Sequence, residues 1–101
     1  MVKKMTFVSI RSDSTIPWYN DSVECSSDPQ WQERFSFINS NRDKIKITVD
    51  RSDEFKLTTE MIFTDEVIYN EFIEFTSAIV EPAAEYCNRN DMYYAYSTED
   101  V

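Results

Sequence analysis

The sequence contains no glycine and no histidine among its 101 residues. At an average usage of about 7%, roughly seven glycines would be expected in a chain of this length. Without glycine, no loop can bring bare backbone close to a phosphate, which excludes P-loops, dinucleotide fingerprints and the G-x-S-x-G nucleophile elbow. Without histidine, the chain lacks the commonest general base and metal ligand. We therefore predict no catalytic residue, no metal site and no cofactor.

Cysteine is scarce as well: Cys25 and Cys87 stand 62 residues apart, with no C-x-x-C pair. We expect both to be free thiols, and neither to be a nucleophile, because no histidine or neighbouring cation activates them. Near the N-terminus, two lysines precede an apolar stretch that polar residues interrupt. This pattern predicts neither a signal peptide nor a membrane span, and hence a cytoplasmic protein.

The charge of the chain is −9 and unevenly distributed, since residues 52–101 carry two Lys/Arg against twelve Asp/Glu. Such a surface repels phosphate backbones and anionic lipid, so we predict no nucleic-acid partner and no membrane. The plain interpretation is a soluble acidic protein. The alternative is an acidic face that mimics nucleic acid or docks on a basic partner protein, for which Glu74 and Glu81 are candidate interaction residues.

Four segments have the composition of strands. Residues 5–11 and 92–96 are apolar at both parities, which predicts strands covered on both faces. Residues 44–49 and 55–63 alternate apolar and polar side chains, which predicts a hairpin with one wet face. The tail, residues 97–101, reads as loose.

The first predicted helix begins at Asp28, an N-cap acceptor followed by a proline, and ends near Asn39. Its apolar stripe, at i, i+4 and i+7, consists of Trp31, Phe35 and Ile38. A strand through Phe35 and Phe37 is the competing interpretation. The preceding connection, residues 12–28, has one apolar segment around Trp18 and Tyr19, which either holds the loop onto the body or forms an exposed recognition tip.

The second predicted helix follows a capping sequence, Thr64-Asp65-Glu66, which places a hydroxyl and two carboxylates at its start. Its buried stripe is formed by Ile68, Phe72, Phe75 and Ile79. Because Pro82 deletes a helical hydrogen bond, we expect a kink or break near residues 80–81, with Pro82 opening a short last turn.

Together these elements predict a single α+β domain over residues 1–101, in the ferredoxin-like βαββαβ order. A four-stranded antiparallel sheet would carry both helices on one face, with the first and third strands in the centre. Its open face would expose apolar side chains of the first and last strands, which predicts a homodimer that joins two open faces as a dimeric α+β barrel. Tyr93, Tyr94 and Tyr96 could instead stack RNA bases, but few cations accompany them.

Several short segments carry a resemblance to small uncharacterised proteins of tailed phages that infect marine cyanobacteria. They are Thr6-Phe7 with Arg11, Pro17-Trp18-Tyr19, the strand from Phe55 to Phe63, and Glu85-Tyr86 with Asn88 and Asn90. Members of this group often have a glycine where Asp91 stands here. The resemblance implies a phage protein in the cytoplasm of the infected host and assigns no catalytic residue.

The predicted architecture is also similar to the dimeric α+β barrel superfamily, which includes cofactor-independent monooxygenases and haem-degrading enzymes. An axial histidine for haem is impossible in this chain. What remains of such a site is a pocket between helix and sheet, with Trp31, Tyr69 and Tyr94 as candidate lining residues and no base.

Three hypotheses follow. The first is a non-enzymatic phage accessory protein that acts by self-association and partner binding. The second is a small-molecule binder or cofactor-independent monooxygenase, and the third is an acidic mimic of nucleic acid. A cavity separates the first two, because a fully packed interior leaves no place for a substrate.

Overall fold

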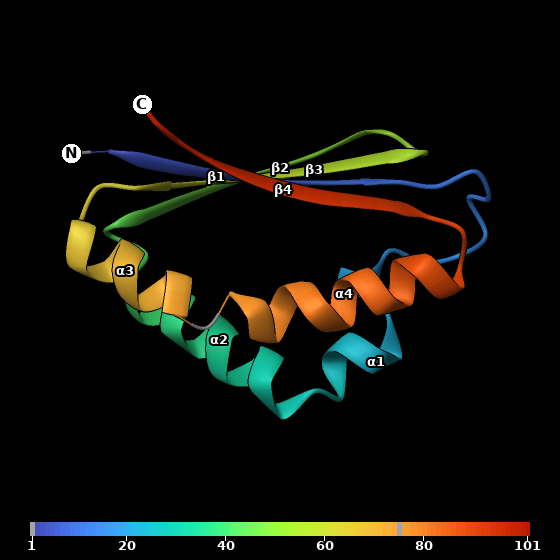
Figure 1. Cartoon of the computed structure of the whole chain (residues 1–101), viewed down its shortest axis with the longest axis horizontal. Coiled ribbons are helices and arrows are strands. Elements are labelled where there is room, and N and C mark those ends of the chain that lie inside the picture. Colours follow the sequence, from blue (N-terminus) through green and yellow to red (C-terminus); the bar gives the residue numbers. More distant parts are fainter. Residues whose placement is uncertain (1, 75) are drawn as a thin grey trace.

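One layer of the molecule is a four-stranded antiparallel sheet (Figure 1). The computed structural model describes residues 2–74 and 76–101, and for residues 77–79 it describes the backbone alone. The strands lie in the order β2-β3-β1-β4, so the first and third strands are central, as predicted. They are β1 (Lys3–Ile10), β2 (Ile45–Asp53), β3 (Lys56–Phe63) and β4 (Tyr93–Asp100).

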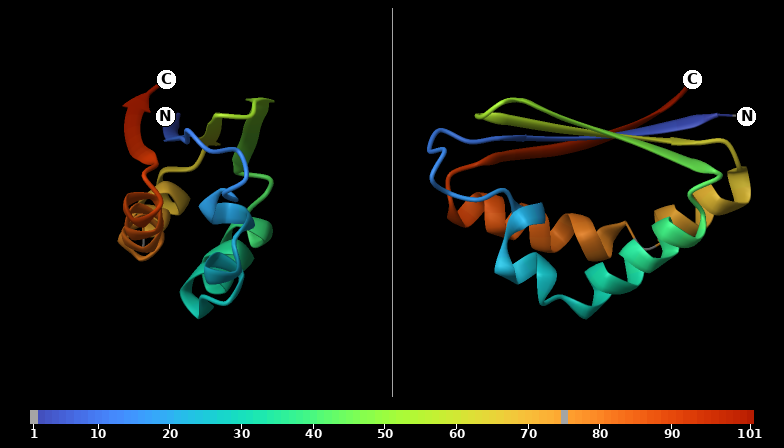
Figure 2. Two further views of the ribbon diagram at one scale, coloured as in Figure 1. Left: turned by 90° about the vertical axis from the view of Figure 1, so that its right-hand side faces the viewer. Right: turned by 180° about the vertical axis from the view of Figure 1, so that it is seen from behind.

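The helices form the second layer and cover one face of the sheet (Figure 2). The connection from β1 to β2 and the connection from β3 to β4 each contain two α-helices, where the sequence predicted one. The first holds a 3₁₀ turn η1 (Tyr19–Asp21), α1 (Val23–Ser26) and α2 (Pro29–Ser40), and the second holds α3 (Glu66–Glu74) and α4 (Ser77–Arg89). The βαββαβ order is confirmed, and the other face of the sheet carries no helix of the described chain.

Aspartate side chains begin α2 and α3. The Asp28 carboxylate accepts a hydrogen bond from the Gln30 amide at 2.9 Å, so the segment that could have been a strand is a helix, as predicted. Asp65 accepts from the amides of the second and third residues of α3, at 2.8 and 3.2 Å. The Thr64 hydroxyl, expected to cap this helix, donates to the Lys44 carbonyl instead.

Of the kink or break expected near residues 80–81, the break is wrong. The chain separates α3 from α4 before Ser77, and Pro82 lies inside α4. One helical hydrogen bond is lost there, but Ala83, Tyr86 and Cys87 in the following turn are buried in the core and hold the helix in place. Of the predicted stripe, Phe72 is buried, whereas Phe75 and the side chain of Ile79 lie outside the described residues.

The C-terminal tail is also ordered, contrary to the prediction. β4 continues to Asp100 and pairs along the whole length of β1, ending with Lys3 opposite Asp100. These two side chains form an ion pair, and the Val101 amide donates to the Val2 carbonyl at 3.1 Å. In the hairpin, β2 runs on to Asp53 through an irregularity after Asp50, and Phe55 lies in the turn rather than on the core face.

The loop after β1 is fixed to the body by one cluster of contacts. The Arg11 guanidinium lies 4.2 Å from the Trp18 ring centroid and donates to the Ile16 carbonyl at 2.6 Å. The Tyr86 hydroxyl donates to the Pro17 carbonyl at 2.6 Å. The segments around Arg11, Trp18 and Tyr86 therefore meet in one place, where they stabilise the loop.

The buried core is divided into two clusters, whereas a domain of this size usually has one contiguous core. The first cluster lies where the loop meets α4 and contains Trp18, Tyr19, Cys25, Leu57, Ala83, Tyr86, Cys87 and Met92. The second lies under α3 and contains Met5, Ile38, Ile45, Met61, Phe63 and Phe72. The interior is therefore not continuously packed between the two clusters.

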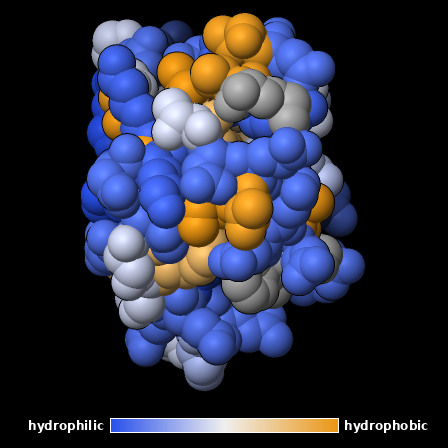
Figure 3. All heavy atoms as spheres, turned by 90° about the vertical axis from the view of Figure 1, so that its left-hand side faces the viewer, coloured by the Kyte–Doolittle hydropathy of each residue, from blue (hydrophilic) through white to orange (hydrophobic). Residues whose placement is uncertain are grey.

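At the end that carries α3 and both chain termini, the surface is mostly hydrophilic, and its apolar atoms form separate small areas (Figure 3). Scattered apolar side chains of this kind are normal for a soluble surface.

Candidate functional site: a cavity between sheet and helices

A cavity of about 600 Å³ lies between the helix-facing side of the sheet and the helices. Its lining comes from both core clusters, since Leu57 and Ala83 belong to one and Met61 and Phe72 to the other. The cavity therefore occupies the gap between the clusters. The full lining is Phe7, Ser9, Asn20, Asp21, Trp31, Phe35, Ile38, Arg42, Ile47, Val49, Arg51, Leu57, Thr59, Met61, Phe72, Ala83 and Tyr94.

The pairing register of the strands determines which residues lie side by side on the floor of the cavity. Ser9 of β1 lies directly between Tyr94 of β4 and Leu57 of β3. In the next row on the same face, Phe7 lies beside Thr59, and its ring stacks on Tyr96 at 5.9 Å between centroids. Because side chains alternate between the two faces of a strand, this set points toward the helices.

One stripe of α2 forms a wall of the cavity. The predicted stripe of Trp31, Phe35 and Ile38 faces it, with the Trp31 and Phe35 rings 6.3 Å apart. Phe35 remains 48% exposed, because it borders this open space rather than packed neighbours. Continuing the helical spacing by four positions, from Ile38 to Arg42, places a cation at the end of the stripe.

The polar groups of the lining are few. Three hydroxyl side chains, Ser9, Thr59 and Tyr94, border the cavity. Within the described chain, none of these hydroxyls makes a hydrogen bond to protein. Burial raises the pKa of Tyr94, with nearby Cys87 adding to the effect, so its hydroxyl stays protonated and can donate a hydrogen bond.

Three charged residues border the cavity: Asp21, Arg42 and Arg51. Arg51 and Asp21 form a two-pronged ion pair with N–O distances of 3.0 and 3.2 Å. Arg42 donates through two nitrogens to the side-chain oxygen of Asn39, at 3.2 and 3.1 Å. No lining residue is therefore a free carboxylate or another group ready to act as a general base.

The sequence-predicted site residues separate into three groups. Trp31 and Tyr94 border the cavity, whereas Tyr69 packs edge-on against Phe63 in the second core cluster and is not part of the lining. Trp18 and Tyr19 are each 5% exposed, so they hold the loop down and form no recognition tip. Glu74 and Glu81 are exposed on α3 and α4.

Sequence reasoning missed the polar lining. Arg42 could have been found by extending the α2 stripe one step beyond the helix, and Thr59 from its place between Leu57 and Met61 on the apolar side of its strand. Ser9 could not, because its strand is apolar at both parities. A buried cation was missed as well: Arg34 lies over the Phe72 ring at 4.7 Å, and burial lowers its pKa to about 10.

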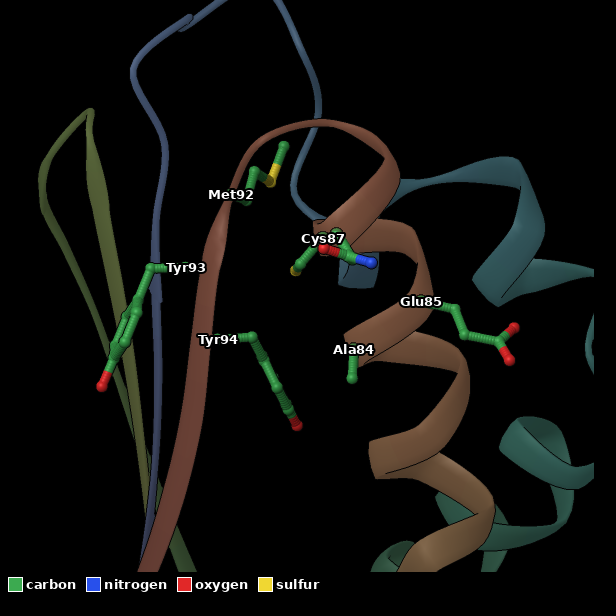
Figure 4. A pocket seen from close by; sticks show the side chains of 7 residues that line it. Ala84, Glu85, Cys87, Met92, Tyr93 and Tyr94 are labelled. Atoms are coloured by element: carbon green, nitrogen blue, oxygen red, sulfur yellow. The ribbon is translucent and has the colours of Figure 1, made fainter.

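A second hollow, of about 480 Å³, lies between the C-terminal half of α4 and the start of β4 (Figure 4). Tyr94 and Cys87 point into the space between strand and helix, while Tyr93 points to the opposite side of β4. Burial raises the pKa of the Cys87 thiol, which stays protonated and therefore unreactive. Because Tyr94 borders both hollows, it forms part of the partition between them.

The described residues contain no group of three or more His, Cys, Asp or Glu side chains arranged to hold a metal ion. None of the helices in the described part of the chain has both the length and the apolarity needed to cross a bilayer.

The comparisons with known proteins show the fold. No protein-family model matches the chain, and no curated protein sequence matches it. A crystal structure of a mutant of SnoaB, a cofactor-independent oxygenase from Streptomyces nogalater, matches with a TM-score of 0.51 and 10% identity, covering 99% of this chain and 91% of that chain. A hydantoinase/carbamoylase family amidase from Burkholderia ambifaria matches at 0.46 and 10% identity, over 98% of this chain but 27% of that chain.

The likeness to SnoaB extends over nearly the whole of both chains, so the ferredoxin-like α+β fold predicted from the sequence is confirmed. At 10% identity, it assigns no residue a role.

Proposed function

We propose that the protein binds an apolar small molecule in the cavity between its sheet and its helices. The observation that carries this proposal is the division of the core into two clusters with a cavity of about 600 Å³ between them. This volume falls within the range of about 300–1,000 Å³ that is usual for small-molecule sites. Mostly apolar walls with a few unsatisfied hydroxyls also match the usual composition of such sites.

The proposal is for binding rather than turnover. SnoaB is a cofactor-independent oxygenase with the same fold, and this likeness supports an oxygenase-like reaction as the second candidate. Against it, the lining contains no histidine, its single carboxylate is held by Arg51, and the Tyr94 hydroxyl stays protonated. A binding role needs none of these groups to accept a proton.

The binding site is tested by filling the cavity from its floor. Thr59→Phe places a large ring in the cavity, and Thr58→Phe makes the same change on the opposite face of the same strand. In an NMR titration with naphthalene-2-carboxamide, we expect saturable shifts of the amides of Ser9, Thr59 and Tyr94 in the natural protein and in Thr58→Phe. The affinity should fall at least about tenfold in Thr59→Phe. Equal affinity in both variants, or no saturable shift in the natural protein, contradicts the proposal.

We further propose that a second copy of the chain covers the open face of the sheet. An apolar patch on this face, the open-face patch, consists of Val8, Ile10, Tyr93 and Ala95, which pair across β1 and β4. Ile10 is 42% exposed and Tyr93 is 58% exposed. A two-fold contact allows such a patch to cover itself.

Charge supports a second copy as the occupant. The pairing of the strands places three cations and four anions on the open face: Lys4, Lys46, Lys56, Asp50, Asp53, Glu60 and Glu99. The face therefore carries a charge of only −1 in a chain whose charge is −9. Two copies repel one another least at this surface.

A role in binding a basic host protein, as expected of a phage accessory protein or a nucleic-acid mimic, is supported by the exposure of Glu74 and Glu81 on the helical layer. Because that layer lies opposite the open face, such a partner and a second copy could bind at the same time.

A further inference from the structure

The charges at the cavity differ in sign from those of the whole chain. Arg42 and Arg51 are its cations and Asp21 is its anion, which gives the lining a net charge of +1 in a protein of −9. At physiological ionic strength, charges act over about 8 Å, so a bound ligand senses the lining more than the distant acidic surface.

Only one of the two cations is already neutralised. Asp21 neutralises Arg51 by accepting a hydrogen bond from each of its two terminal guanidinium nitrogens. Arg42 has no carboxylate within 4 Å in the described structure, and its hydrogen bonds go to the neutral side-chain amide of Asn39. These two bonds orient the guanidinium without cancelling its charge.

The position of Arg42 suits a ligand with one charged end. It follows the C-terminus of α2, where a cation is favoured by the helix dipole, and it continues the stripe that begins at Trp31. A ligand lying along this stripe would rest its apolar body on Trp31 and Phe35 and reach the cation with its end. The floor hydroxyls can donate hydrogen bonds to further oxygen atoms of the ligand.

We infer that the ligand of this cavity is a monoanion with an apolar body, such as an aryl or alkyl carboxylate, whose charged group binds Arg42 at the cavity mouth. The inference rests on the proposed function, because it names the chemical class bound at the same site. A charge-assisted bond between guanidinium and carboxylate is stronger than a neutral hydrogen bond and selects the anion over its uncharged analogue.

The test compares three ligands of nearly the same shape: naphthalene-2-carboxylate, naphthalene-2-carboxamide and naphthalen-2-ylmethylammonium. Their affinities are measured by NMR titration at pH 7. The natural protein should bind the carboxylate about tenfold tighter than the carboxamide, and the ammonium ion most weakly. Arg42→Gln should bind the carboxylate and the carboxamide equally, while Arg42→Lys keeps part of the preference.

A control variant and the affinity for the carboxamide show whether a negative result counts against the inference or against the proposed function. Lys46→Gln removes one positive charge from the opposite face of the sheet and should leave the preference unchanged. An unchanged carboxamide affinity in Arg42→Gln shows that the cavity is intact. If the carboxamide binds but the carboxylate gains nothing, or if the preference survives in Arg42→Gln, the inference is wrong and the proposed function stands. If none of the three ligands binds, the proposed function itself fails.

Discussion

Both thiols are buried in the same core cluster, and their ionisation is tied to folding. Burial raises the pKa of Cys25 from 9.0 to about 12, with Asp28 and Asp21 adding to the effect, and burial also raises the pKa of Cys87. Tyr19 follows the same rule, since burial raises its pKa from 10.0 to about 12. In the folded protein these groups stay neutral at a pH where the unfolded chain ionises them.

The stability of the protein should therefore depend on alkaline pH. Groups with a raised folded pKa contribute stability that is complete below the unfolded pKa and is lost as pH rises toward the folded value. We expect the free energy of unfolding, measured with urea, to be constant between pH 7 and about 8.5 and to fall from pH 9 toward 12. Cys25→Ala should weaken the fall between pH 9 and 10, leaving the part due to Cys87 and to tyrosine.

Thiol labelling gives the same prediction a second measurement. At pH 8, both thiols should react with an aromatic disulfide reagent about tenfold or more slowly in the folded protein than in urea. Rapid labelling of the folded protein, or a free energy of unfolding that stays constant to pH 11, would show that the thiols are not buried as described.

At the scale of elements, the turn between α4 and β4 stores strain in a single residue. Asp91 has a φ of 56°, and no other described residue has a positive φ. The Met92 amide donates to the Cys87 carbonyl at 2.7 Å and the Asp91 amide to the Asn88 carbonyl at 3.5 Å. This is the Schellman arrangement, in which the left-handed position is usually glycine. In this chain, an aspartate occupies it.

Replacing this aspartate should stabilise the protein. Asp91→Gly relieves a left-handed penalty of about 1–2 kcal/mol and pays about 0.5–1 kcal/mol in backbone entropy, so the free energy of unfolding should rise by about 0.5–1 kcal/mol. Asp91→Val should lower it, because a branched side chain fits that conformation poorly. Asp43→Gly, which removes the same charge at a turn without positive φ, should be destabilising. A loss of stability in Asp91→Gly would contradict this account.

Side-chain periodicity predicted the strand order and most of α2, but it could not predict features set by backbone pairing or tertiary contacts. Residues 97–100 are all exposed and carry no apolar pattern, yet β1 offers them hydrogen-bond partners along its full length. Pro82 remains inside α4 because its neighbours are buried. In the cavity, Trp31 was found from its helical stripe, whereas Ser9 could not be placed, because β1 is apolar at both parities and the sequence does not show which side faces the helices.

At the scale of the whole molecule, the two faces of the sheet differ in what covers them. The helix-facing side is covered by the chain's own helices, except for the cavity. The other side carries the open-face patch at one end, bordered by Lys56, and an ion-pair network at the other, where Lys4 is paired with Glu60 at 3.2 Å and with Glu99 at 3.7 Å. The charged end is satisfied within one chain, so only the apolar end gains from a partner.

If a second copy covers this patch, a charge placed in it should separate the copies. Burying a new charge in an interface costs about 2 kcal/mol or more, so Ile10→Lys should raise the dimer dissociation constant about thirtyfold or more. Sedimentation equilibrium of the natural protein should give a dimer, and that of Ile10→Lys a monomer with an unchanged far-UV circular dichroism spectrum. Val67→Lys, on the exposed side of α3, should remain dimeric. A natural protein that stays monomeric at high concentration would leave the open-face patch in water and refute the second copy, while binding in the cavity would be unaffected.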